Sequence, residues 1–446
     1  MKVYSLKRIL AFGLAALMLL AVAGCGKSEN SSGSGSGGKE ASSPGQQGSA
    51  DSLSEYIGEN GKIDTSKLTP YKAAEVATVN GRNIIKHNGK PYLYNALHFR
   101  YKGLESGLAT PIAKKMFEEG MQKIKESGVD TVILYIYWED MYDGKTYNFD
   151  NLKYQYDVAI KNDLKIQINW FGYDNCGYGG FMRSKYPALE VDDPDITEEV
   201  PDLSKQIFID EEIEAIQQLC AFINIYDKDR RTVAIQLENE PDMGEGGMGN
   251  WLSQFSVMVD LLNKLGEAVH NSSYSMITKI NLTMSGWDEV WEGLDYPARV
   301  NKVIEQPHLD LVGPDLYDTN TTQDISFYNK GTNIPAHLEL GPSVWSAIGQ
   351  YVYHLVNGYG MGWYDLIDIG FSGHHGLYRL NPDKYEERDG TQILGTPYKG
   401  EIEGSTKEFI AMSNSVGALK ELLASVPVSD MAGFNVKMKN VASDTK

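Results

Sequence analysis

The chain has 446 residues, of which 42% are apolar, 11% aromatic and 23% charged. This composition is typical of a large globular protein and excludes a peptide or a small disulfide-rich scaffold. The 41 Lys and Arg residues against 60 Asp and Glu give a formal charge of −19, so nucleic acid is not an expected partner. Three cysteines, Cys25, Cys176 and Cys220, are too few for a disulfide framework and lack the paired spacing of a zinc site.

The N-terminal segment has the charge and hydropathy order of an export signal. Basic residues precede an apolar run from Ile9 to Ala23, which is too short to span a membrane comfortably. The run ends in Val22-Ala23-Gly24-Cys25, which resembles a bacterial lipobox; the alternative is a plain signal peptide with an incidental thiol. We therefore expect residues 1–24 to be a lipoprotein signal peptide and Cys25 to carry a lipid. The protein would then be exported and anchored to the outer face of the bacterial cell membrane.

The next segment is a tether, and the rest is one folded domain. Residues 25–54 are rich in Gly and Ser and contain no apolar periodicity, which is typical of a flexible linker. Residues 55–446 are expected to form a single catalytic domain with a short N-terminal hairpin, marked by Asn80-Gly81 and Asn88-Gly89, and a C-terminal tail.

Strand and helix patterns alternate along this domain. The first helix is expected from Thr110, an N-cap residue followed by proline, to Gly128. Eight apolar strands are expected at residues 92–97, 129–138, 164–170, 232–237, 276–283, 309–317, 335–340 and 362–367. Later helices are expected at 152–162, 211–226, 251–269 and 406–424. This pattern predicts an α/β fold, a (β/α)8 TIM barrel; the alternative is the two-lobed, doubly wound fold of binding lipoproteins.

Two carboxylates stand out at the predicted strand ends, where barrel enzymes place their chemistry. Glu240 follows the fourth strand in VAIQLENEP, and Glu339 ends the seventh in IPAHLELG. Strands 4 and 7 face each other across the mouth of a closed ring, which allows a carboxyl separation of about 5 to 5.5 Å, as retaining glycosidases use. Glu238, in contrast, fits a cap or a solvated rim charge.

The remaining candidates have weaker patterns. Trp138, Trp170 and Trp363 lie at strand ends and are read either as a sugar-binding platform or as core residues. His98 fits a supporting hydrogen-bonding role. The eight histidines form no HxxxH or HxH cluster, and His374-His375 would point to opposite sides of a strand, so no metal and no cofactor are expected.

The strand 2 to strand 4 region resembles a known group of enzymes. The stretch GVDTVILYIYWEDMYDGKTYNFDNLKYQYDVAIKNDLKIQINWFG and the segment TVAIQLENEP resemble β-galactosidases of families 35 and 42 in clan A of the retaining (β/α)8 glycoside hydrolases. The resemblance implies that Glu240 is the acid/base, Glu339 the nucleophile and Asn239 a ligand of the sugar 2-hydroxyl. It also implies a set of residues lining the subsite: Arg100, Trp138, Asn175, Tyr317 and Trp363.

Two departures from family 35 concern the substrate. Strand 4 continues as Glu240-Pro241, the form common in mannanase-like and cellulase-like relatives, and strand 3 ends in Trp170-Phe171-Gly172. We expect a β-galactosidase-like exo enzyme acting on a β-linked carbohydrate. The alternatives are an endo-acting β-mannanase or glucanase-like hydrolase and a non-catalytic carbohydrate-binding lipoprotein.

Overall fold

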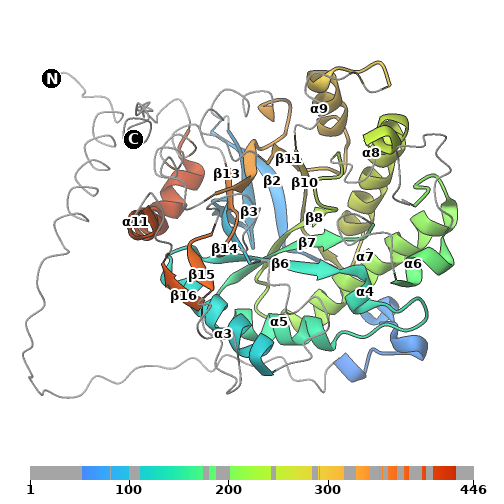
Figure 1. The fold of residues 1–446 in the computed structure, drawn as a ribbon, viewed down its shortest axis with the longest axis horizontal. Coiled ribbons are helices and arrows are strands. Elements are labelled where there is room, and N and C mark those ends of the chain that lie inside the picture. The colour runs from blue at the N-terminus through green and yellow to red at the C-terminus, as the bar shows by residue number, and fades with distance from the viewer. Residues whose placement is uncertain are drawn as a thin grey trace, which may run out of the picture.

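The computed structural model contains eight parallel strands side by side in one sheet (Figure 1). They are β5 (Asn95–His98), β6 (Thr131–Tyr137), β7 (Lys165–Phe171), β8 (Thr232–Leu237), β10 (Ile277–Leu282), β11 (Leu311–Pro314), β12 (Ala336–Leu340) and β13 (Gly360–Trp363). The structure describes residues 53–80, 82–99, 111–173, 180–186, 201–242, 248–283, 290, 292–315, 328–341, 351, 354, 360–368, 376–380, 394–397 and 405–427.

The sheet closes on itself. Its order is β11-β10-β8-β7-β6-β5-β13-β12, and a parallel bridge between Asp315 and Glu339 joins the two end strands. Every residue of β6 and of β8 is buried, as expected when a parallel sheet is covered on both faces. The closed ring confirms the predicted (β/α)8 barrel and does not fit the two-lobed alternative.

Helices lie outside the strands (Figure 1). They are α3 (Pro111–Glu126), α4 (Trp138–Met141), α5 (Asp150–Lys161), α6 (Gly180–Lys185), α7 (Gln206–Tyr226), α8 (Met248–His270), α9 (Tyr296–Ile304) and α11 (Ser405–Ser425). Local sequence sets their ends: the Asp295 carboxylate caps α9 by accepting a hydrogen bond from the backbone of Ala298 at 3.0 Å. None of the helices in the described ranges is long and apolar enough to cross a membrane.

A small antiparallel sheet covers the end of the barrel where the strands begin. It consists of β2 (Ala74–Val79), β3 (Arg82–His87) and β4 (Lys90–Tyr92). Asn88 and Gly89, which join β3 to β4, both have positive φ, as a two-residue hairpin turn requires. Ile85 and Tyr92 of this sheet pack with apolar residues near the beginnings of the barrel strands: Ala234, Ile277, Leu311 and Ala336.

Short strands complete the structure. They are β1 (Tyr71–Lys72), which pairs with β9 (Tyr274–Ser275), and the three strands of a further sheet, β14 (Ile367–Asp368), β15 (Tyr378–Leu380) and β16 (Leu394–Pro397).

The predicted strands agree with the structure except at some ends. The fourth strand, 232–237, coincides with β8. The expected first strand, 92–97, divides into the end of β4 and the start of β5, because the chain leaves the small sheet before it enters the barrel. The expected last strand, 362–367, is instead β13 at 360–363, and Trp138 begins α4 rather than ending β6.

Candidate active site

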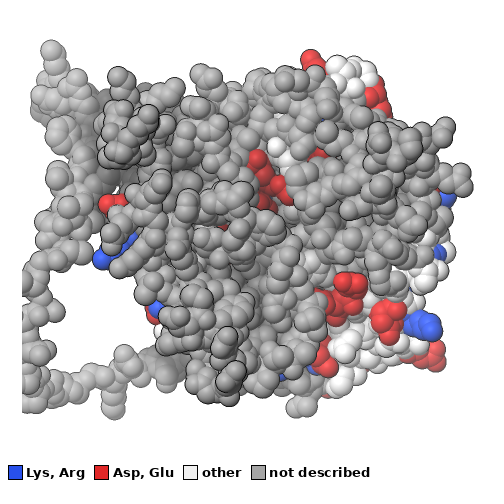
Figure 2. All heavy atoms as spheres, in the orientation of Figure 1, with Lys and Arg blue, Asp and Glu red and all other residues white. Residues whose placement is uncertain are grey.

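Three carboxyl groups meet at the end of the barrel where the strands finish. Glu240 follows β8, Asp315 follows β11, and Glu339 lies in β12. One oxygen atom of each residue lies within 4.8 Å of one oxygen atom of the other two. The space-filling view also has acidic side chains at the surface near the centre of the face shown (Figure 2). The structure therefore brings together the two predicted carboxylates and adds a third.

An irregularity in β12 determines where Glu339 lies. Ala336 and Leu338 pack in the cluster at the base of the barrel, whereas Leu340 belongs to the outer core between strands and helices. Simple alternation would place residues 338 and 340 on the same face. The pairing with β13 shifts register between His337 and Leu340, and such a bulge redirects side chains at a strand end. Glu339 thereby reaches the carboxyl cluster.

Two side-chain amides, those of Asn239 and Asn281, connect Glu240 with Asp315. The backbone N–H of Glu240 donates to Oδ1 of Asn281 at 2.9 Å, and the Asn239 amide donates to Glu240 Oε2 at 3.3 Å. The amide nitrogen of Asn281 donates to Asp315 Oδ2 at 2.5 Å and to Asn239 Oδ1 at 3.1 Å. Glu240 has a φ of 47°, in the left-handed region that non-glycine residues seldom adopt. Backbone and amides together hold the Glu240 turn against β10 and β11.

The cluster lies in an electrostatically unusual setting. Burial, followed by the nearby Glu339 and Glu240, raises the pKa of Asp315 well above its ordinary value. Below the carboxyls, the fully buried Lys279 of β10 donates to the Tyr94 hydroxyl at 3.0 Å. Burial lowers the pKa of Lys279 to about 7, although Asp315 and Glu339 act in the opposite direction. A protonated Asp315 adds no negative charge beside the two glutamates.

Aromatic side chains from β6 and β7 form a packed group of their own, apart from the outer core. Tyr135, Tyr137 and Phe171 form one packed group, against which Tyr364 lies partly buried. The buried His98 accepts a hydrogen bond from the Tyr135 hydroxyl and donates one to the Leu338 carbonyl oxygen, both at 2.8 Å. Both ring nitrogens are therefore occupied, and burial keeps the pKa of His98 well below its ordinary value. This matches the supporting role expected for His98.

The three tryptophans proposed as a sugar platform are core residues. Trp138, Trp170 and Trp363 each have no exposed surface. The indole of Trp138 packs among aromatic rings of the outer core, including Phe181 and Phe208. Alternation along each strand explains the error, because Trp170 points outward where its neighbour Phe171 points inward.

Hydrogen bonds hold two of these indoles in place. Trp170 Nε1 donates to a Glu212 oxygen at 3.1 Å, and Trp363 Nε1 donates to Asn95 Oδ1 at 2.8 Å. The residues predicted as lining by resemblance, Trp138 and Trp363, thus face the helices and not the mouth.

Glu238 is not the solvated rim charge that the sequence suggested. Its side chain is fully buried and accepts hydrogen bonds at 3.1 Å from the backbone N–H groups of Gly172 and Tyr173. A side chain at Gly172 would overlap Glu212 and Glu238. Burial raises the pKa of Glu212. Glu238, at the end of β8, thus bonds the end of β7 and supports the turn that carries Glu240.

The other predicted site residues, Arg100, Asn175 and Tyr317, lie outside the described residues, as do Cys25 and His374-His375. Sequence reasoning missed Asp315 and Asn281. Asp315 could have been identified as a polar residue at the end of the sixth predicted strand. Asn281 lies on the same face of β10 as Ile277, which packs in the barrel interior. Tyr135 and Tyr137 were visible by the same alternation on β6.

The same three carboxyls are close enough together to hold a cation. Among the residues that the structure describes, Glu240, Asp315 and Glu339 form a group whose oxygens are close enough to share one metal ion. Oxygen ligands of this kind suit hard cations such as Ca²⁺ or Mg²⁺. The expectation of no metal rested on histidine spacing and did not consider this group.

Comparison with solved structures identifies the fold. No protein-family model matches the sequence, and no curated protein matches it significantly. The endo-1,4-β-mannanase from Rhizomucor miehei superposes with a TM-score of 0.51 at 13% identity, covering 77% of this chain and 99% of that one.

Two larger proteins match equally well. The exo-β-1,4-mannosidase Op5Man5 from an Opitutaceae bacterium, strain TAV5, has a TM-score of 0.51 at 14% identity over 79% of this chain. The β-galactosidase from Rahnella sp. R3 has a TM-score of 0.51 at 11% identity over 75% of this chain. The match spans 64% of the mannosidase and 57% of the galactosidase. These neighbours are glycoside hydrolases with TIM-barrel folds, and at such identities the likeness establishes the fold.

Proposed function

We propose that this protein is a retaining glycoside hydrolase acting on β-linked sugars. The observation that carries the proposal is the pairing of Glu240 after the fourth barrel strand with Glu339 in the seventh, with carboxyl oxygens within 4.8 Å of each other. Retaining enzymes need two carboxyls at about 5 to 5.5 Å, so that one can attack the anomeric carbon while the other protonates the leaving group.

In this mechanism, Glu339 attacks the anomeric carbon and Glu240 donates a proton to the departing oxygen. Glu240 then removes a proton from water, which attacks the same carbon and releases the sugar with retained configuration. Asn239, which donates to Glu240, would also contact the sugar 2-hydroxyl. Because the raised pKa favours a protonated Asp315, Glu339 can stay ionised without a second charged carboxylate against it.

The first proposed substrate is a terminal β-galactoside, because the strand 2 to strand 4 segments resemble β-galactosidases. A β-mannan or β-glucan is the second, since Asn239-Glu240-Pro241 has the form of mannanase-like enzymes. A purely carbohydrate-binding role is less well supported, because a binder gains nothing from carboxyls that repel each other. Arg100, Asn175 and Tyr317 remain proposed lining residues.

We also propose that the enzyme acts outside the cell. Removal of residues 1–24 and lipidation of Cys25 would leave the barrel on a Gly/Ser-rich tether of residues 25–54. Metabolic labelling with a lipid analogue, compared between the parent and Cys25→Ala, tests this anchor.

The decisive experiment is hydrolysis of a panel of aryl β-glycosides followed by NMR of the first anomer released. Retention is expected, on galactosides first and then on mannosides or glucosides. Unchanged activity in the presence of EDTA would separate this mechanism from one that uses a cation at the carboxyl cluster. Inversion of configuration would contradict the proposed roles.

Variants assign the two glutamates. Glu339→Ala should lower kcat by more than about 10⁴-fold, because no group remains to form the covalent intermediate. Glu240→Ala should lower it by about 10² to 10⁴-fold on poor leaving groups, which need the acid. On activated aryl glycosides, whose first step needs no acid, azide should restore turnover by attacking the glycosyl-enzyme in place of the water that Glu240 activates. Glu55→Ala, at an exposed position, is the matched control. Parental rates in both site variants would overturn the assignment.

A further inference from the structure

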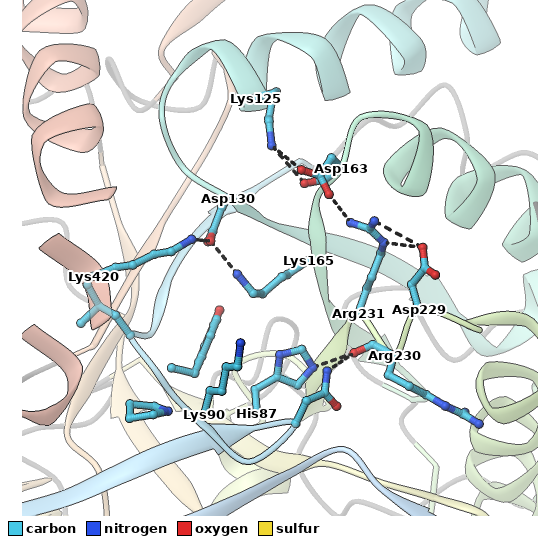
Figure 3. Close-up of a pocket in the computed structure, with 14 residues that line it drawn as sticks. His87, Lys90, Lys125, Asp130, Asp163, Lys165, Asp229, Arg230, Arg231 and Lys420 are labelled. Carbon is cyan, nitrogen blue, oxygen red and sulfur yellow. Dashed lines mark hydrogen bonds and ion pairs between the residues drawn. The ribbon is translucent and has the colours of Figure 1, made fainter. Parts of the chain in front are cut away.

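A pocket of about 440 Å³ lies at the opposite end of the barrel, where the strands begin (Figure 3). Side chains from separate elements line it: Lys90 from β4, Lys125 from α3, Lys165 from β7, Arg231 from the segment before β8 and Lys420 from α11. We call this the basal pocket. It shares no residue with the carboxyl cluster.

The charge of the basal pocket is opposite to that of the chain. The described residues that line it include six Lys and Arg and three Asp, in a protein of formal charge −19. The Lys and Arg residues are Lys90, Lys125, Lys165, Arg230, Arg231 and Lys420, and the Asp residues are Asp130, Asp163 and Asp229. The guanidinium of Arg230 lies over the Tyr71 ring and points away from the pocket (Figure 3), which leaves five cationic groups among these residues.

The carboxylates do not neutralise these cations. A single oxygen of Asp130 accepts from both Lys165 at 2.6 Å and Lys420 at 2.5 Å. Burial opposes ionisation of Asp130, but the two ammonium groups outweigh it and lower its pKa to about 2. Asp130 is therefore ionised at neutral pH, and this one carboxylate pairs with two ammonium groups.

The other two carboxylates, Asp163 and Asp229, already form ion pairs. Asp163 pairs with Lys125 and Arg231, and Asp229 pairs with Arg231. Lys90 is exposed at the rim and has no ion pair among the residues described. In Figure 3 the ammonium groups of Lys90 and Lys165 point toward the same space. An anion placed there would meet three ammonium groups, from Lys90, Lys165 and Lys420.

We propose that the basal pocket binds a phosphate or sulfate group through Lys90, Lys165 and Lys420. A compact multivalent oxyanion offsets the local excess and accepts a hydrogen bond from each ammonium. The volume exceeds what a single ion needs and falls within the range of small-molecule sites, so an ester such as a sugar phosphate also fits. A free ion, a sugar ester and a lipid headgroup share this chemistry.

Titration calorimetry at low salt tests the proposal with three probes. They are inorganic phosphate, glucose 6-phosphate, and vesicles of phosphatidylcholine and phosphatidylglycerol in equal parts. We expect the parent to bind phosphate and the sugar ester, and to bind more weakly as salt rises. Tighter binding of the sugar ester than of phosphate would identify a small-molecule ester site, and binding confined to vesicles would identify a headgroup site.

Lys90→Ala should weaken phosphate binding by about tenfold, the effect of one charge-assisted hydrogen bond, and Lys90→Glu should abolish it. Lys420→Ala should also weaken phosphate binding. The Asp130 carboxylate does not become unpaired in this variant, because Lys165 still pairs with it. Lys145→Ala is the matched control, because Lys145 is another exposed lysine with no ion pair in the described part of the chain.

Two results would overturn the proposal: no binding of any probe, or equal binding by Lys90→Ala and Lys145→Ala. Glycoside hydrolysis should be unchanged in Lys90→Ala, because Lys90 lies at the other end of the barrel. The basal pocket and the proposed hydrolysis can therefore fail independently.

Discussion

Asp315 is the residue on which the electrostatics of the carboxyl cluster depends. It is 5% exposed, accepts from Asn281, and lies beside two further carboxyls. Its raised pKa means that the folded state binds a proton more tightly than the unfolded chain does. The stability that this proton gives is fully present below the unfolded pKa of about 4 and is lost as the pH rises through the folded pKa.

Asp315→Asn should therefore change the pH dependence of stability. Asparagine cannot ionise, and its Oδ1 can still accept from Asn281. The variant should unfold at a similar urea concentration to the parent near pH 4 and at a progressively higher one toward pH 9. The alkaline limb of kcat/KM should also extend to higher pH in the variant, because no third negative charge develops beside Glu339 and Glu240.

Urea titrations and pH–rate profiles of the two proteins check this prediction. Parallel stability curves from pH 4 to 9 would show that Asp315 titrates alike in the folded and unfolded states. Asp150→Asn, at an exposed helix position, provides the control for loss of an ordinary surface carboxylate.

How far the sequence predicts the site also depends on single residues. Glu240 and Glu339 were predicted as site residues because each ends an apolar run in a barrel pattern, and β8 was placed correctly for the same reason. The inward or outward phase of a side chain is a different kind of information. Trp170 and Phe171 are both aromatic residues at the end of one strand. Whether each side chain points to the outer core or into the barrel depends on the alternation of the strand, and an unbroken apolar run does not reveal that alternation.

At the scale of elements, β11 and β12 hold the cluster together. The register shift in β12 was invisible in its sequence, AHLEL, because a bulge depends on the partner strand. The short β11, Leu311–Pro314, has a glycine at a position without room for a side chain. A Cβ atom on Gly313 would overlap the carbonyl oxygen of Ala336 in β12, and β12 would have to move.

Gly313→Ala should consequently lower the free energy of unfolding by about 3 kcal/mol, at the upper end of the usual cost of overpacking. It should also reduce kcat, because displacement of β12 separates Glu339 from Asp315 and Glu240. Gly58→Ala is the control, since its Cβ would make only an ordinary contact with the Lys62 carbonyl oxygen, and its effect should stay within about 0.5 kcal/mol. Full activity and stability in Gly313→Ala would show that β12 is not fixed by this contact.

At the scale of the whole molecule, the two ends of the barrel have different tasks. The end where strands finish holds polar and acidic groups whose burial costs free energy, including Lys279 and Asp315. The other end is covered by the β2–β4 sheet, whose apolar residues continue the barrel core. Stability built at the covered end offsets the cost of burying charge at the mouth.

This division predicts that the covered end can be weakened without loss of chemistry. Ile85 of β3 is 2% exposed and packs with Leu311 and Ile277 at the start of their strands. Ile85→Ala should cost about 3 kcal/mol of unfolding free energy, because it removes buried methylene groups and leaves a cavity. Ile57→Ala, at a position that is 41% exposed, should cost less than about 1 kcal/mol.

The kinetic constants decide whether the ends are separable. Below its unfolding temperature, Ile85→Ala should keep the parental kcat and KM, since the sheet that it loosens lies at the far end of the strands from Glu240 and Glu339. A large fall in kcat at a temperature where the variant is still folded would mean that packing at the base is transmitted along β11 to Asp315. The barrel would then be a single mechanical unit, and the mouth would depend on the base for its geometry as well as for its stability.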